Sequence, residues 1–154
     1  MNSLTETAAH LAQLAVAFVL ALPIAWDREQ KERSAGLRTF TLVATSTCGF
    51  LIAARSSIGP SADAESRVWQ GLLTGIGFIG SGAILKTEGS VRGTATAASI
   101  WNTAAVGAAV AYGNYDIAMV LSAVNFAVLR WLAPLKASSP DMPVEENRHR
   151  DSSS

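Results

Sequence analysis

The sequence is poor in charge, in cysteine and in histidine. Only 16% of its 154 residues are charged, whereas roughly 25% are charged in a typical soluble domain. Its single cysteine, Cys48, excludes a disulfide framework within the chain and is expected to be a small core residue. The two histidines, His10 and His149, lie near opposite ends, and neither a metal-ligand spacing nor a nucleophile–base set is present. We therefore expect no metal, no cofactor and no enzymatic activity.

The sequence also lacks an excess of either charge, with 12 basic and 12 acidic residues. Domains that bind nucleic acid usually carry a basic patch or stripe, so we expect no nucleic-acid partner. The first ten residues hold Glu6 and no lysine or arginine, so the basic start of a secretory signal peptide is missing. We expect the first apolar segment to stay in the mature protein.

Apolar residues, by contrast, make up 49% of the chain and gather in long runs. Five runs approach the roughly 20 residues that a helix needs to cross a bilayer, at about 7–26, 37–54, 68–85, 94–111 and 115–132. Each should be helical, because lipid offers no hydrogen-bond partner for open backbone. The expected fold is all-α, a polytopic membrane helix bundle of about five transmembrane helices over residues 1–135. Residues 136–154 are rich in serine, proline and charge, and we expect them to form a disordered cytoplasmic tail.

Basic residues are divided unequally between the two sides of this bundle. Ten lie in the first and third connections or at the C-terminal end, and only Arg55 and Arg67 lie on the opposite side. Cytoplasmic loops are enriched in lysine and arginine. The asymmetry therefore predicts a multi-pass protein with its N-terminus outside and its C-terminus in the cytoplasm.

Charged residues are most concentrated directly after the first run. Asp27, Arg28 and Glu29 are each followed four residues later by an opposite charge, so the first helix should continue beyond the membrane surface. Two interpretations remain open: weak pairs on a solvated helix, or a network of Arg28, Glu29 and Arg38 that binds an anion or a partner at the cytoplasmic mouth. The candidate functional network combines these residues with polar side chains of later segments: Arg28, Glu29, Arg38, Thr39, Arg92 and Asn102.

The stretch from Gly71 to Leu85 holds five of the chain's twelve glycines. Its Gly-x-Gly-x-x-Gly spacing at 75–80 lacks the preceding strand and the later acidic residue of a dinucleotide-binding site, so we reject that function. A glycine inside a helix costs about 1 kcal/mol relative to alanine, so the bare backbone should serve close helix contact or a ligand. The glycines fall on two nearly opposite sides of a helix, which predicts a central helix packed on both sides. A backbone-lined ligand site is the alternative.

The run that follows Gly93 predicts another tightly packed helix. Thr94 or Thr96 could cap its first turn. Its small residues would let it approach the third helix closely: Ala97, Ala98, Ala104, Ala105 and Gly107. Trp101 lies too deep in the run for an interfacial residue and is expected to pack between helices.

Asn102 in this run and Asn125 in the next are polar residues inside apolar segments, so each needs an internal partner. They could form an interhelical hydrogen bond, or line a permeant or regulatory site. The candidate helix-packing motif joins the small and aromatic residues of the third and fourth runs: Gly71, Gly75, Gly77, Gly80, Gly82, Gly93, Thr96 and Trp101.

Three segments occur in order along the chain: Arg28-Glu29 with 35–39, then 75–85, then 91–93 with 96–101. Together they resemble the MgtC/SapB family of bacterial inner-membrane proteins, over about 17–132. The resemblance implies a multi-helix protein of the bacterial inner (plasma) membrane, linked to growth in low magnesium and, in some pathogens, to survival inside host cells. The MgtC branch carries a folded cytoplasmic C-terminal domain that this sequence does not show, so the chain is more similar to the minimal SapB type. Ala25 and Asp27 stand where the family usually has glycine and glutamate.

The resemblance also implies a regulator of other membrane machines, among them the ATP synthase and magnesium transport systems. The leading hypothesis is a non-enzymatic protein that modulates such a partner, linked to magnesium homeostasis or low-magnesium adaptation, through helix–helix contact in the lipid bilayer. Its partner would be another integral membrane protein or a second copy of itself. The alternative is a small Mg²⁺ or H⁺ transporter or channel, which could act as an oligomer. It ranks second because no acidic residue lies firmly inside an apolar run, and such residues commonly mark cation pathways.

Overall fold

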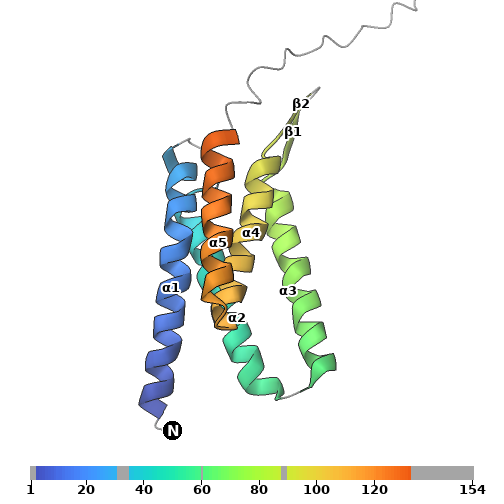
Figure 1. Ribbon diagram of the computed structural model, residues 1–154. Helices are drawn as coiled ribbons and strands as arrows, with labels where there is room; N and C mark the ends of the chain where they lie inside the picture. Colours follow the sequence, from blue (N-terminus) through green and yellow to red (C-terminus); the bar gives the residue numbers. More distant parts are fainter. Residues whose placement is uncertain (1–2, 31–34, 60, 88–89, 133–154) are drawn as a thin grey trace, which may run out of the picture.

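The computed structural model describes residues 3–30, 35–59, 61–87 and 90–132, and these form a bundle of five long helices (Figure 1). The helices are α1 (Ser3–Gln30), α2 (Leu37–Ile58), α3 (Ala62–Gly82), α4 (Thr94–Ala111) and α5 (Tyr115–Ala127). A single π-helical turn, η1 (Val128–Leu132), continues α5, and two short strands, β1 (Leu85–Thr87) and β2 (Ser90–Arg92), lie between α3 and α4. The all-α bundle predicted from the sequence is confirmed. The tail at 136–154 lies outside the described residues.

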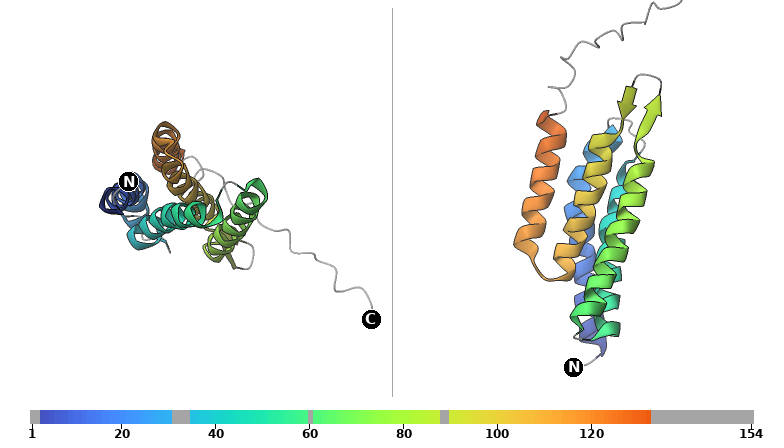
Figure 2. Two further views of the ribbon diagram at one scale, coloured as in Figure 1. Left: turned by 90° about the horizontal axis from the view of Figure 1, so that it is seen from below. Right: turned by 90° about the vertical axis from the view of Figure 1, so that its right-hand side faces the viewer.

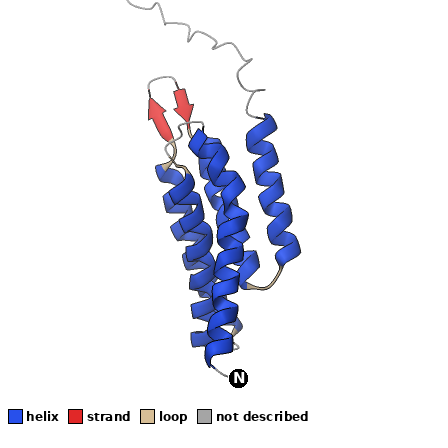
Figure 3. Ribbon diagram, turned by 90° about the vertical axis from the view of Figure 1, so that its left-hand side faces the viewer, coloured by secondary structure: helices blue, strands red, loops and turns tan. Residues whose placement is uncertain are grey.

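Three segments are long and apolar enough to cross a membrane by length and composition, namely α1, α2 and α5 with η1. The helices α3 and α4 carry more polar residues or more small ones, and their passage across the bilayer stays a prediction. All five helices run roughly along one axis, with the two strands at the end away from Ser3 (Figure 3). We call this the hairpin end; α1 ends there, α2 begins there, and α3 ends there.

The centre of the bundle is α4, which packs against each of the other four helices. Ten of its residues are buried, whereas only Ile76 and Gly80 are buried in α3. Viewed along the bundle, α3 stands at one edge and α1 at the other (Figure 2, left). The prediction that the glycine-rich helix is central is therefore wrong within one chain. The angular position of glycines reveals bare backbone, but it cannot reveal whether the chain itself covers that backbone.

A close helix crossing joins α4 to α2. A Cβ atom added at Gly107 would lie 2.2 Å from the backbone oxygen of Ala44, so only glycine fits there. The prediction that small residues of α4 approach the third helix is confirmed for Ala97, which meets Gly80, but Gly107 faces α2 instead. The approach is real, but the sequence alone does not say which helix lies across the small residue.

Apolar side chains form two core clusters along the bundle axis. The one farther from the hairpin end is built mainly from small residues of α1, α2 and α4, and it contains Cys48, which is fully buried. The other lies at the hairpin end, where Ile24 of α1, Phe40 of α2 and Ile100 of α4 meet. The core position expected for Cys48 is confirmed.

A β-hairpin replaces the last residues of the third predicted span. The helix α3 ends at Gly82, and Leu85 begins β1, which pairs antiparallel with β2 in the register Leu85↔Arg92. Gly93 follows with φ +88°, and a Cβ atom there would lie 1.9 Å from the backbone oxygen of Ala83. This glycine also occupies the N-cap of α4 without a side-chain cap, so the predicted cap by Thr94 or Thr96 is wrong.

Candidate functional site

The charged residues at the end of α1 form a buried ion pair at the hairpin end. Arg28 Nη2 lies 2.9 Å from Asp27 Oδ2, and the Arg28 side chain is only 4% exposed. Within the part of the chain that the structure describes, Arg28 Nε has no hydrogen-bond partner. The predicted extension of α1 beyond the apolar run is confirmed as far as Gln30. The i, i+4 partners at 31–33 lie outside the described residues.

Glu29 joins the end of α1 to the start of α2. Its Oε2 accepts a hydrogen bond of 2.8 Å from the backbone N–H of Leu37, the first residue of α2. The carboxylate thereby satisfies a free N–H group at a helix N-terminus, where the helix dipole also favours negative charge. A Cβ atom at Gly36 would lie 1.9 Å from this Oε2, so Gly36 leaves room for the contact.

The other members of the candidate network are not joined to this pair. Arg38 and Arg92 are exposed at the hairpin end, and Thr39 is half-buried. Over the described ranges, Asp27–Arg28 is the only ion pair. The structure thus gathers Arg28, Glu29, Arg38 and Arg92 at one end, as the charge count predicts, but gives each a separate environment.

Asn102 lies deeper in the bundle and does not belong to that end. Its Nδ2 donates a hydrogen bond of 3.1 Å to the backbone oxygen of Leu121 on α5. Asn125 and Ser99 form a second contact between α4 and α5, with Ser99 Oγ 2.8 Å from Asn125 Oδ1. The interhelical hydrogen bonds expected for both asparagines are confirmed, and they fasten α5 to α4.

The glycine-rich helix α3 leaves most of its bare backbone uncovered. A Cβ atom at Gly80 would contact the backbone oxygen of Ala97 at 3.4 Å, which is how α3 packs on α4. The other glycines of α3 meet no neighbour within 4 Å in the described chain: Gly71, Gly75, Gly77 and Gly82. Phe78 projects between them with 81% of its surface exposed.

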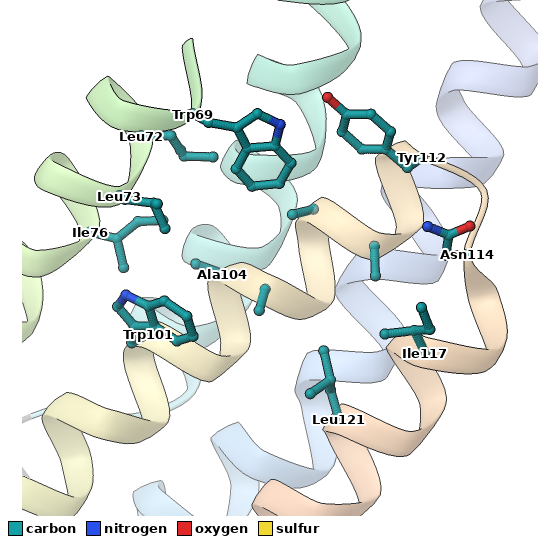
Figure 4. Close-up of a pocket in the computed structure, with 13 residues that line it drawn as sticks. Trp69, Leu72, Leu73, Ile76, Trp101, Ala104, Tyr112, Asn114, Ile117 and Leu121 are labelled. Atoms are coloured by element: carbon teal, nitrogen blue, oxygen red, sulfur yellow. The ribbon is translucent and has the colours of Figure 1, made fainter. Parts of the chain in front are cut away.

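The rest of the packing motif divides between core and surface. Thr96 is buried in the first turn of α4. Trp101, expected to pack between helices, is half exposed and lines an open cleft of about 360 Å³ between α3 and α5, whose floor is α4. In the close-up, Leu73 and Ile76 of α3 face this cleft from one side, and Ile117 and Leu121 of α5 lie across it (Figure 4).

A second cleft, of about 460 Å³, lies on the other flank of α3, against α2. It is lined by Leu42 and Phe50 of α2 and by Gly71, Gly75 and Ile79 of α3, among others. We call the two spaces the α3–α5 cleft and the α2–α3 cleft. Because a cleft lies on each flank of α3, this helix contacts the bundle mainly along a narrow seam with α4.

A polar cluster at the end opposite the hairpin holds α3 in place, and the sequence did not predict it. Arg55 Nη1 donates to the backbone oxygen of Ala111 at 3.2 Å, and its guanidinium lies 4.6 Å from the ring centroid of Tyr112. The Tyr112 hydroxyl donates to Glu65 Oε1, and its ring stacks on Trp69 with the centroids 5.6 Å apart. These residues come from α2, α3 and the end of α4, so no spacing along the chain marks them.

The environment of Tyr112 shifts its titration. Burial raises the pKa of the Tyr112 hydroxyl, and its hydrogen bond to the Glu65 carboxylate raises the pKa further. The neutral hydroxyl is therefore the form that the folded chain favours. This residue fastens α3 to the bundle in its protonated state.

The described residues contain no group of three or more histidine, cysteine, aspartate or glutamate side chains that could hold a metal ion. The fold and its surfaces instead define a class, that of an integral membrane bundle with an apolar, partly uncovered helix at one edge.

The chain belongs to the MgtC family, whose model matches residues 14–138. It is 41% identical over 128 residues to Protein MgtC of Brucella abortus (strain 2308), which covers 82% of this chain and 53% of that protein. It is 34% identical over 115 residues to Protein MgtC of Salmonella typhimurium (strain 14028s / SGSC 2262), covering 75% and 48%. The chain thus spans about half the length of these relatives. No solved structure matches it. The family resemblance carried by the three motifs is confirmed.

Proposed function

We propose that this protein is a non-enzymatic regulator of the bacterial inner membrane that modulates a partner membrane machine linked to magnesium homeostasis or low-magnesium adaptation. The observation that carries the proposal is the outer face of α3, which we define by Thr74, Gly77, Phe78 and Ser81. These four residues are exposed and lie within one sector of about 100° on the helix. The partner is another integral membrane protein that packs a helix on this face.

Physical chemistry supports a protein partner there. An interior glycine costs about 1 kcal/mol of helix stability relative to alanine, and Gly77 on this face gains no contact within the described chain. Small residues on a membrane helix let a second backbone approach closely, and van der Waals packing then drives association. Phe78 adds a large apolar side chain at one edge of the same face.

Contacts at both of its ends also hold α3 in position against the bundle. The Tyr112–Glu65 contact holds α3 at one end. Its seam with α4 at Gly80 and the hairpin after Gly82 hold it at the other. A docking helix would therefore meet a surface that is already ordered, which lowers the entropic cost of association.

Single-cysteine crosslinking tests the proposal. In a Cys48→Ala background, Thr74→Cys and Ser81→Cys place thiols on the outer face with little change in size. Val120→Cys, on an exposed position of α5, is the matched control. We expect the two α3 variants to trap a second integral membrane protein in bacterial membranes, and the α5 variant to trap none.

The comparison also decides between kinds of partner. If the crosslinked species contain only this chain, the outer face of α3 is a surface for self-association, and the proposal of a different partner protein is wrong. Equal trapping from α3 and α5 would indicate random collision, and the proposed docking face would then be abandoned. Mass spectrometry of the gel bands distinguishes these results.

A small Mg²⁺ or H⁺ transporter is the second candidate, and the buried Asp27–Arg28 pair favours it. The pair lies at the predicted cytoplasmic mouth of the bundle, where an ion entering it would meet a buried charge. Against it, the polar groups within the helices, Ser99, Asn102 and Asn125, are engaged in hydrogen bonds between α4 and α5. Purified protein in liposomes would move ions faster than empty vesicles if this candidate holds, and Asp27→Asn would reduce that flux.

A further inference from the structure

The α2–α3 cleft lies along a stripe of α2 that begins with a charged residue at the hairpin end. Four residues of this stripe are spaced four apart: Arg38, Leu42, Ser46 and Phe50. Residues at that spacing lie on one side of a helix. The last three line the α2–α3 cleft, and Arg38 is exposed one turn beyond its hairpin end.

We propose that this cleft binds one acyl chain of an anionic phospholipid whose phosphate is held by Arg38. The walls are apolar from Leu42 on α2 to Ile79 and Gly75 on α3, as a hydrocarbon chain requires. The two glycines of the α3 wall, Gly71 and Gly75, have no side chains to fill the space. The acyl chain would therefore cover the glycine backbone on this flank of α3, which the described chain leaves uncovered.

The length of the stripe fits an acyl chain that spans one leaflet of the bilayer. From Arg38 to Phe50 the helix rises by about 18 Å, close to the depth of one leaflet of a hydrocarbon core about 30 Å thick. The cleft, of about 460 Å³, is lined along this length by apolar side chains and bare glycine backbone, which suits a slender hydrocarbon chain.

The charges at the hairpin end complement an anionic headgroup. Lys86 and Arg92 of the hairpin are exposed there together with Arg38. The two described carboxylates nearby are engaged elsewhere, since Asp27 pairs with Arg28 and Glu29 accepts the N–H of Leu37. In the described chain no carboxylate lies within ion-pair distance of Arg38 or Arg92. The free positive charge therefore favours a lipid phosphate with net negative charge over a zwitterionic headgroup.

This site is independent of the partner face. The residues Thr74 and Ser81 lie on the opposite side of α3 from Ile79, by the 100° rotation per residue. A lipid in the α2–α3 cleft would hold α3 at a set distance from α2, and so would fix the position of the outer face.

Native mass spectrometry of the full chain in detergent tests the proposal. Phosphatidylglycerol, phosphatidylcholine and inorganic phosphate are titrated separately onto the wild type and its variants. We expect phosphatidylglycerol to bind more tightly than phosphatidylcholine. Arg38→Gln should weaken phosphatidylglycerol by about fivefold, the amount that one basic residue contributes near an anionic surface. Arg67→Gln, which removes an exposed charge at the far end of α3, should leave it unchanged.

A second pair of variants tests the acyl chain. Ser46→Leu places a larger side chain in the cleft and should weaken both lipids, whereas Ala123→Leu on exposed α5 should not. Equal affinity for the two lipids, or equal effects of Arg38→Gln and Arg67→Gln, would overturn the proposal. So would displacement of phosphatidylglycerol by inorganic phosphate, which would indicate an anion site without a chain site. Circular dichroism confirms that each variant is folded.

Discussion

At the scale of single residues, two glycine environments in this chain have opposite physical meaning. Gly107 lies where α4 crosses α2, and its missing side chain lets the two backbones meet. Gly77 lies on the outer face of α3, where no described atom approaches within 4 Å. From the sequence alone the two environments cannot be distinguished, because both residues are glycines in apolar helices.

Substitution by alanine should separate the two glycines. Gly107→Ala forces a Cβ atom against the Ala44 backbone oxygen, and overpacking of this kind costs about 1–3 kcal/mol. Gly77→Ala meets no neighbour and should stabilise α3 by up to about 1 kcal/mol. Thermal unfolding in detergent measures both, and a lower midpoint for Gly77→Ala would contradict the open environment of this residue. The same variant should still weaken crosslinking to the proposed partner.

Tyr112 provides a second prediction at this scale, in its dependence on pH. Its pKa is raised in the folded chain, so over the pH range above its unfolded value of about 10 the folded state keeps a proton that the unfolded state loses. The free energy of unfolding should therefore be unaffected by this residue below pH 10 and should fall as the pH rises above it.

The variant Tyr112→Phe should remove that fall and should also lose the hydrogen bond to Glu65, for about 1 kcal/mol at neutral pH. Its ring would still stack on Trp69, so the fold should be kept. Denaturant unfolding at several pH values measures both effects. An identical alkaline decline in the wild type and in Tyr112→Phe would show that other groups cause it.

At the scale of elements, the helices follow from apolar length, and the hairpin follows from backbone geometry. The runs ending near Ala54 and Ala111 become α2 and α4 with bounds close to those expected. The run ending at Leu85 is interrupted, because Ala83 and Gly93 meet and turn the chain into β1 and β2. Apolar composition cannot detect this turn, since Leu85 and Val91 are as apolar in a strand as in a helix.

Two glycines with positive φ test the hairpin. Gly93→Ala combines a left-handed backbone, which costs about 1–2 kcal/mol for other residues, with a clash against Ala83. Gly113→Ala, at φ +75° after α4 and with no neighbour within 4 Å, carries only the backbone strain. Gly93→Ala should thus lower the unfolding midpoint more. Equal losses would mean that the contact with Ala83 adds nothing.

At the scale of the whole molecule, the basic residues lie in two groups at opposite ends of the bundle. Arg28, Arg38, Lys86 and Arg92 lie at the hairpin end, and Arg55 with Arg67 lies towards the other. This agrees with the alternating connections that the count of basic residues assumed. The side of the membrane that each end faces is a prediction of the same count.

Labelling from outside the cell tests that orientation. In a Cys48→Ala background, Asp63→Cys near the start of α3 should react with a membrane-impermeant maleimide in intact cells. Lys86→Cys in the hairpin should react only after the membrane is permeabilised. The reverse pattern would place the hairpin end outside and would contradict the orientation from basic residues. Reaction of both thiols in intact cells would contradict the passage of α3 across the bilayer.

The sequence by itself determined the helical class, the number and approximate bounds of the long helices, and the family. These depend on local properties, since apolar length and short motifs can be recognised without knowing what lies opposite them. It also predicted that Asn102 and Asn125 need internal partners, because lipid provides none. The tertiary structure alone decided that α4 is central and α3 peripheral, and that Arg55, Glu65 and Tyr112 meet. Those facts depend on which helix faces which, and close packing between distant segments settles that only when the chain is folded.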